Sequence, residues 1–158
     1  MRNIADKFND ISIYETDDYL RFRDLFTASG LEFNLDDTGE RPEGFVSAFA
    51  CEDQDGRLIA ASAITRRKGY FILNDIAVEE SRRGRGLGEA LLDYTIDKMV
   101  SLGAEQIYIT ARAPKFFEKY GFIYLAKEDV PEIFGCLECK QLGKTCNPEF
   151  MKYNIIGE

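Results

Sequence analysis

The sequence contains no histidine, and this absence removes several kinds of active site. Catalysis by a serine or cysteine nucleophile with a histidine base is excluded, and so is every zinc site with a histidine ligand. No apolar run approaches the roughly 18 residues that a membrane-spanning helix needs. Residues 1–10 are polar and do not resemble a secretory signal, so we expect a cytoplasmic protein without a membrane partner.

Basic residues and cysteine are also scarce. The chain has 20 Lys and Arg against 28 Asp and Glu, for a net charge of −8. This balance argues against nucleic acid as a partner, because phosphate binding depends on positive surface, and it is compatible with an amine substrate. With 158 residues, 45% of them hydrophobic, the chain is long enough for one domain, residues 1–158, with its own core. The four cysteines suggest a reducing compartment.

The periodicity of apolar residues predicts a mixed sheet with helices on its faces. A short strand at 11–14 precedes a helix from Thr16 to Gly30, where Thr16 is the expected N-cap. A loop then precedes an antiparallel meander, after which helices and strands alternate. The meander strands are expected at 46–51, 57–66 and 70–78, the later helices at 85–103 and 114–120, and the later strands at 106–110, 122–126 and 149–156.

A glycine-rich turn leads from the third meander strand into the long helix. Gly84, Gly86 and Gly88 allow an anion to approach backbone amides that the first helical turn leaves unpaired. Arg83 and Arg85 add positive charge, so the turn is suited to a pyrophosphate. The G-x-G-x-G spacing matches neither the Walker pattern nor the dinucleotide fingerprint, and an ordinary surface turn is the alternative.

The segment Arg83-x-x-Gly86-x-Gly88 matches the R/Q-x-x-G-x-G/A signature of the GCN5-related N-acetyltransferases, the GNAT superfamily, which residues 74–78 and 116–122 also resemble. The resemblance implies an α/β (α+β) fold, with a mostly antiparallel sheet of six to seven strands flanked by about four helices. Acetyl-CoA would lie in a splay between the fourth and fifth strands, where an amine attacks the thioester directly. The implied cofactor-binding residues are Ile76, Ala77 and Val78 for the pantetheine arm, Arg83, Gly84, Arg85, Gly86, Leu87 and Gly88 for the pyrophosphate, and Phe117.

Two residues are candidates for proton transfer. Asp75 stands where related enzymes often have an acidic base, and burial in a narrow cleft would raise its pKa. The alternative is an ordinary carboxylate at the end of a strand. Phe117 replaces the tyrosine that is the usual acid of the family, so Tyr120, one helical turn later, is the substitute candidate. A core role for Tyr120, with water protonating the thiolate, remains open.

Residues 109–122 and 129–131 are similar to the acetyltransferase domain of N-acetylglutamate synthases. That similarity implies a small-molecule acceptor, such as an amino acid, and makes Arg112 a candidate ligand for its carboxylate. Two alternatives stay open: acetylation of a protein lysine or N-terminus, and a regulator that binds acetyl-CoA without turnover.

Three cysteines lie in an insert at about 135–148 between the last two strands. Cys136, Cys139 and Cys146 could bind zinc or another metal, with Cys51, a carboxylate or water as the fourth ligand. A disulfide and free thiols are the alternatives. Whether the chain forms a homodimer is not specified by the sequence.

Overall fold

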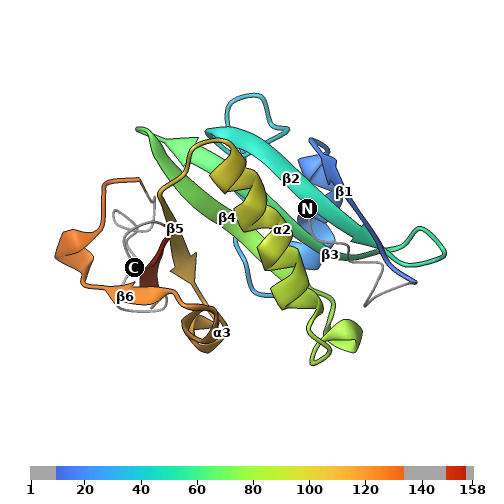
Figure 1. The fold of residues 1–158 in the computed structure, drawn as a ribbon. Helices are drawn as coiled ribbons and strands as arrows, with labels where there is room; N and C mark the ends of the chain where they lie inside the picture. The colour runs from blue at the N-terminus through green and yellow to red at the C-terminus, as the bar shows by residue number, and fades with distance from the viewer. Residues whose placement is uncertain (1–9, 134–148, 156–158) are drawn as a thin grey trace.

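The computed structural model describes residues 10–133 and 149–155, which form one seven-stranded sheet in the order β1-β2-β3-β4-β5-β7-β6 (Figure 1). Neighbouring strands are antiparallel except for β4 and β5, which are parallel. The predicted mixed, mostly antiparallel sheet is therefore confirmed. The strands are β1 Ser12–Thr16, β2 Phe45–Glu52, β3 Leu58–Arg67, β4 Tyr70–Val78, β5 Gln106–Ala111, β6 Ile123–Leu125 and β7 Glu149–Asn154.

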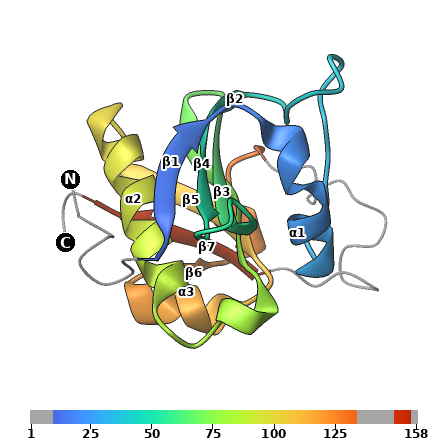
Figure 2. The same ribbon diagram turned by 90° about the vertical axis from the view of Figure 1, so that its right-hand side faces the viewer.

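Helices cover both faces of the sheet. The long helix α2, Leu87–Ser101, packs on one face through apolar residues spaced at helical intervals, such as Leu87, Leu91 and Ile96. The short helix α1, Arg23–Ala28, lies on the opposite face with the 3-10 turn η2, Tyr19–Phe22, before it (Figure 2). Two large apolar cores follow from this arrangement, one on each face of the sheet, and Ile72, Tyr108 and Ile133 form a third, small cluster.

The parallel strands β4 and β5 are paired over only a short length. Phe71 pairs with Ile107 and Ile72 with Tyr108, and no later residue of β4 pairs with β5. β4 runs on to Val78, whereas the rest of β5 pairs with β7 on its other side. The splay between the fourth and fifth strands that the family resemblance implies is therefore present.

A β-bulge interrupts the pairing of β4 with β3 just beyond the point where β4 leaves β5. Asn74 is the extra residue, inserted between Leu73 and Asp75. Leu73 before the bulge and Ile76 after it both pack in the core under α2. The bulge thus changes the alternation of side chains, and Asp75 points to the face that η2 covers.

The predicted helices differ from the structure mainly in where they begin. The part of the chain that the structure describes has three α-helices, the third being α3, Pro114–Tyr120, together with 3-10 turns. The expected helix 16–30 starts later, because Thr16 is the last residue of β1 and its hydroxyl accepts a hydrogen bond only from the amide of Asp18, at 3.1 Å. Helix α2 begins at Leu87 rather than near Arg85.

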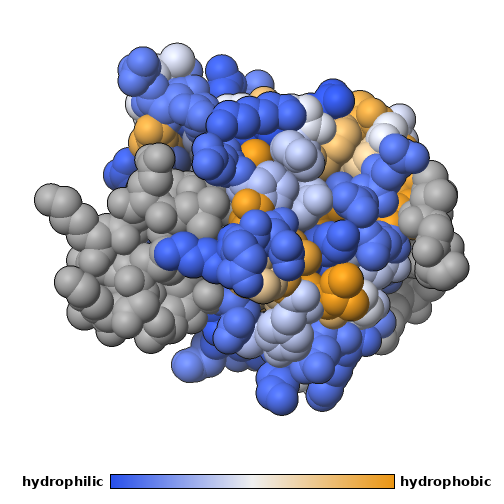
Figure 3. Space-filling model, turned by 90° about the vertical axis from the view of Figure 1, so that its left-hand side faces the viewer, coloured by the Kyte–Doolittle hydropathy of each residue, from blue (hydrophilic) through white to orange (hydrophobic). Residues whose placement is uncertain are grey.

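The seventh strand was correctly predicted, and it lies between β5 and β6. β6 is consequently an edge strand, with Ile123 and Tyr124 48% and 44% exposed. Viewed from the side of β6, apolar residues form small patches among hydrophilic ones (Figure 3). Within the described residues, no helix combines the length and hydropathy that a bilayer-spanning segment requires.

Candidate active site

The glycine-rich turn leaves a row of backbone amides open at the start of α2. Gly84 and Gly86 have φ angles of 81° and 86°, in the left-handed region that favours glycine, and Gly86 is the N-cap of the helix. The amides from Gly84 to Gly88 make no backbone hydrogen bond to any described residue. Together with the positive end of the helix dipole, these amides form a site suited to an anion.

The two arginines of the turn differ in their contacts. Nε of Arg83 donates to the carbonyl of Val78 at 2.8 Å, and its Nη2 donates to Oγ of Ser29 at 3.4 Å. Arg83 therefore ties the turn to the end of β4 and to the C-terminus of α1. Arg85 is exposed.

Helix α3 contributes an aromatic ring to the same region. A Cβ at Gly88 would lie 3.4 Å from two ring atoms of Phe116 and 3.5 Å from a methyl group of Val78. Phe117, the expected cofactor contact, is 4% exposed and packs against Phe116 and Phe122 in the core. Phe116 therefore lies against the turn, next to Phe117, the residue that the sequence analysis named as a cofactor contact.

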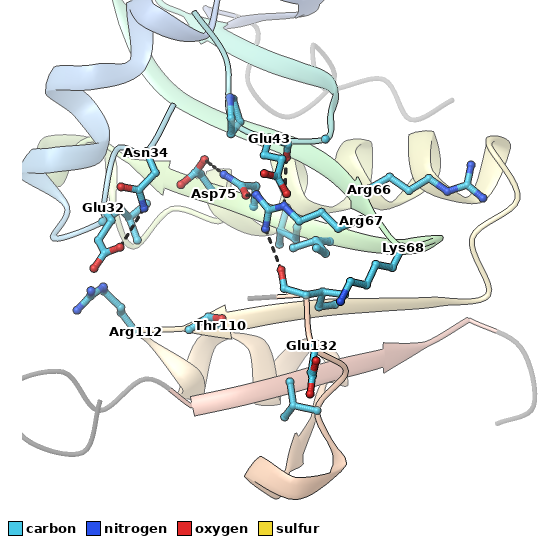
Figure 4. Close-up of a pocket in the computed structure, with 18 of the residues that line it drawn as sticks. Glu32, Asn34, Glu43, Arg66, Arg67, Lys68, Asp75, Thr110, Arg112 and Glu132 are labelled. Atoms are coloured by element: carbon cyan, nitrogen blue, oxygen red, sulfur yellow. Dashed lines mark hydrogen bonds between the residues drawn. The ribbon is translucent and has the colours of Figure 1, made fainter. Parts of the chain in front are cut away.

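A cavity of about 1410 Å³ opens beside the bulge in β4. Asn74 and Asp75 line it from β4, and Thr110 and Arg112 line it from the end of β5 and the segment that follows. Glu32 and Asn34 approach from the loop after α1 (Figure 4). The structure therefore places the predicted base Asp75 and the predicted acceptor ligand Arg112 on the walls of one cavity.

Asp75 is a buried carboxylic acid with two hydrogen-bond donors. Only 6% of the residue is exposed, and Oδ2 accepts hydrogen bonds from the hydroxyl of Tyr19 at 2.5 Å and from Nδ2 of Asn74 at 2.6 Å. Burial raises the pKa of Asp75 to about 6, although both donors and the nearby charge of Arg67 act in the opposite direction. The raised pKa expected from the sequence is confirmed, and the group is ionised at neutral pH while its pKa is close enough to accept a proton.

Sequence reasoning missed the contribution of Tyr19. Its position on the apolar side of an expected helix indicated only a core residue, and its ring is indeed buried. The hydroxyl that meets Asp75 lies 56 positions earlier in the chain, and no local pattern reports such a contact.

Arg67, also unpredicted, connects three walls of the cavity. Its guanidinium donates to the carbonyl of Glu43 at 3.1 Å, to the carbonyl of Ile133 at 3.2 Å, and to Oδ1 of Asn74 at 3.2 Å (Figure 4). Burial lowers the pKa of Arg67, while the charges of Glu43 and Asp75 raise it. The side chain therefore holds the rim of the cavity and the bulge in one arrangement.

Arg112 and Glu32 face one another across the mouth of the cavity (Figure 4). The Arg112 side chain is exposed. Two residues earlier, Oγ1 of Thr110 is buried without a hydrogen-bond partner among the described residues. One end of the cavity thus presents a guanidinium and a carboxylate together, a combination suited to a ligand with both an ammonium and a carboxylate group.

Tyr120, the candidate acid, is not among the residues that line this cavity. Its hydroxyl donates to Oδ1 of Asp93 on α2 at 2.5 Å, and its ring packs against Phe122 and Tyr153. The structure therefore does not bring Tyr120 together with Asp75.

The metal prediction falls mostly on residues that the structure does not describe. Cys136, Cys139 and Cys146 lie outside the described residues, while Cys51 is fully buried in β2. Burial raises the pKa of the Cys51 thiol to about 12, which disfavours the thiolate that a metal requires. Residues 10–133 and 149–155 contain no group of three side chains arranged to hold a metal ion.

Solved structures share this fold. N-acetylglutamate synthase from Neisseria gonorrhoeae, complexed with coenzyme A and N-acetyl-glutamate, aligns at a TM-score of 0.72 and 18% identity, covering 93% of this chain and 35% of that one. The chain therefore spans about a third of that protein's length. Rv2747 from Mycobacterium tuberculosis, in complex with CoA and NLQ, aligns at 0.69 and 16% identity, covering 90% of this chain and 99% of that one.

An acetyltransferase of the GNAT family from Staphylococcus aureus Mu50 aligns at a TM-score of 0.66 and 16% identity, covering 91% of this chain and 98% of that one. At these identities the likeness shows the fold. The family is shown by sequence: a model described as the acetyltransferase (GNAT) family matches residues 6–122, from before β1 to just beyond α3. This chain belongs to the acetyltransferase (GNAT) family.

Proposed function

We propose that the protein transfers the acetyl group of acetyl-CoA to the primary amine of a small molecule that also bears a carboxylate, such as an amino acid. The observation that supports this proposal most strongly is the position of Asp75. This buried acid lies on β4, the strand that also runs into the anion-binding turn, and it faces a cavity large enough for an acceptor. A proton acceptor and a cofactor site are thus held by one rigid element.

The splay between β4 and β5 gives acetyl-CoA a place to bind. Beyond Ile72, the edge of β4 that faces β5 pairs with no described strand, so the backbone groups of the segment Ile76–Val78 that point to this edge are available to the pantetheine amides, apart from the carbonyl of Val78, which accepts a hydrogen bond from Arg83. The amides from Gly84 to Gly88 would receive the pyrophosphate. The thioester would then lie between the strands, close to the bulge at Asn74.

The chemistry needs a neutral amine at the thioester carbonyl. In our proposal Asp75 accepts a proton from the acceptor ammonium, directly or through water, and the amine nitrogen forms a bond to the carbonyl carbon. The attacking nitrogen then loses its second proton to water, and collapse of the tetrahedral intermediate breaks the carbon–sulfur bond and releases CoA thiolate, which takes a proton from water. Arg112 would hold the acceptor carboxylate, and the N-acetyl-glutamate in the Neisseria structure is the kind of product that this arrangement would form.

A panel of acceptors tests the proposal. Purified protein is incubated with acetyl-CoA and single amino acids, polyamines or lysine peptides, and both released CoA thiol and acetylated product are measured. We expect turnover with an amino acid and a rate that rises with pH through about 6, the pKa of Asp75. Asp75→Asn should remove this acidic limb while retaining acetyl-CoA binding.

Two results would contradict the proposal. Turnover confined to peptides would indicate a protein acetyltransferase. Tight acetyl-CoA binding without turnover of any acceptor would indicate a regulator.

A further inference from the structure

Two donors converge on the same oxygen of Asp75. The Tyr19 hydroxyl and the Asn74 amide both donate to Oδ2, at 2.5 Å and 2.6 Å. Oδ1 accepts no hydrogen bond from the described residues, and Asp75 lines the cavity. The carboxylate is therefore asymmetric, with one oxygen occupied by the protein and the other available to a ligand.

Both donors are themselves fixed by their surroundings. The ring of Tyr19, 1% exposed, stacks on Phe33 with a centroid distance of 4.9 Å and packs edge-on against Phe22. This packing leaves the hydroxyl no alternative position, because the ring fills a close-packed space.

The amide of Asn74 is held from its other end. Its Oδ1 accepts hydrogen bonds from Thr65 Oγ1 at 3.3 Å and from Arg67 Nη2 at 3.2 Å. The NH₂ group is consequently directed at Asp75. The bulge at Asn74 and the hydrogen bond from Arg67 to Asn74 thus both help to fix the position of the Asp75 carboxylate.

We propose that Tyr19 is a positioning residue for acetyl transfer: by donating to Oδ2, it holds Asp75 so that Oδ1 faces the acceptor amine. This inference rests on the proposed function, because it concerns the same proton transfer. It extends the catalytic apparatus to η2, an element outside β4 and the glycine-rich turn.

The groups around Asp75 show how the loss of the Tyr19 hydroxyl would change the pH dependence of the reaction. The groups that face Asp75 are Tyr19 from η2, Asn74 from β4 and Arg67 from β3. The hydrogen bond from Tyr19 lowers the pKa of Asp75 against the effect of burial. Burial and the charge of Asp75 raise the pKa of Tyr19 well above its usual value, so the hydroxyl stays a donor throughout the working range of pH.

The other charged groups of the cavity are the same in the unmodified protein and in Tyr19→Phe, so they do not account for a difference between the two pH profiles. The other charged residues that line the cavity are Glu32, Glu43, Arg66, Lys68, Arg112, Lys127, Glu128 and Glu132. All of them are retained when only the hydroxyl of Tyr19 is removed, so a change in the pH profile reports on the contact with Asp75.

Tyr19→Phe tests the proposal because it removes the hydroxyl and keeps the buried ring. We expect kcat to fall about tenfold, the effect of losing one hydrogen bond to a charged group. KM for acetyl-CoA should stay unchanged, and the midpoint of the acidic limb should move to higher pH. The matched control is Tyr14→Phe, which removes a tyrosine hydroxyl that donates to Glu52 at 2.7 Å outside the cavity.

The outcomes separate this inference from the proposed function. A folded Tyr19→Phe variant with the kcat and acidic limb of the Tyr14→Phe control would overturn the positioning role. A lower kcat with an unmoved midpoint would also overturn it, since that result indicates a structural effect. Absence of turnover in the unmodified protein with every amine would instead refute the proposed function.

Discussion

Phe116 lies against the first turn of α2 at Gly88, so that a Cβ on Gly88 would be 3.4 Å from two atoms of the ring. The same Cβ would be 3.5 Å from Val78 at the end of β4. The end of β4, the start of α2 and the start of α3 therefore meet at one point beside the splayed strands. The two sequence motifs that resemble the GNAT family are parts of one structural unit, which explains why they occur together.

Gly86→Asp should abolish most of the affinity for acetyl-CoA. The substitution places a carboxylate at the N-cap of α2, where the pyrophosphate is proposed to bind, and like charges repel at short range. We expect a loss of at least about tenfold in affinity by isothermal titration calorimetry, since hydrogen bonds to charged groups are each worth about 1.5–3 kcal/mol.

The control for backbone strain in this experiment is Gly56→Asp. Gly56 has a φ of 79°, close to the 86° of Gly86, and it lies in an open turn between β2 and β3. Both variants incur the left-handed penalty of about 1–2 kcal/mol in folding stability. Equal affinities for acetyl-CoA in the two folded variants would exclude the turn as the pyrophosphate site.

Asp75→Asn should stabilise the fold at neutral pH. The folded protein holds the Asp75 proton with a pKa of about 6, against 3.8 in the unfolded chain, so the stability of the unmodified protein falls as pH rises between these values. This difference corresponds to about 3 kcal/mol above pH 6. Asparagine retains an oxygen for Tyr19 and Asn74 and does not bear the buried charge.

Urea unfolding at a series of pH values measures this effect. The variant should be more stable than the unmodified protein at pH 8, and the two should converge as pH falls toward 4. A constant difference between pH 4 and pH 8 would mean that Asp75 does not titrate with a raised pKa in the folded protein.

Much of the fold could be predicted from the sequence because its signals are local. The meander is predicted by turns such as residues 53–56 and by alternating apolar residues, and α2 is predicted by the long amphipathic run 87–101. The prediction of a helix starting at Thr16 was wrong because it relied on local signals alone. Asp17 and Asp18 suit a helix start, but pairing of β1 with β2 through Thr16 prevails over local propensity.

Candidate site residues could be named from the sequence only where a motif or a charge marked them. Asp75, the glycine-rich turn and Arg112 were recognisable, and the structure places Asp75 and Arg112 on one cavity. Tyr19 and Arg67 were not, because their contacts join η2, β3, β4 and the segment at Ile133 across the fold. Such contacts depend on the bulge at Asn74, whose position no periodicity discloses.

Tyr120→Phe should reduce stability and leave kcat unchanged. The hydroxyl is engaged with Asp93 on α2, outside the residues that line the cavity, so its loss removes a hydrogen bond worth about 1 kcal/mol. Thermal unfolding and steady-state kinetics on the same preparation separate the two effects. A selective fall in kcat at constant KM would restore Tyr120 as the acid that protonates the thiolate.

Arg112→Ala should weaken the acceptor and spare the cofactor. Arg112 lines the cavity from the segment after β5, opposite Glu32, and a guanidinium can hold a carboxylate through two parallel hydrogen bonds. We expect KM for an amino-acid acceptor to rise about 10- to 100-fold, as for lost hydrogen bonds to a charged group. KM for acetyl-CoA should stay unchanged, and the decarboxylated analogue of the acceptor should show no such increase.

Lys119→Ala, on the exposed side of α3, controls for the loss of one positive charge. An equal increase for the acceptor and for its decarboxylated analogue would show that Arg112 does not recognise the carboxylate.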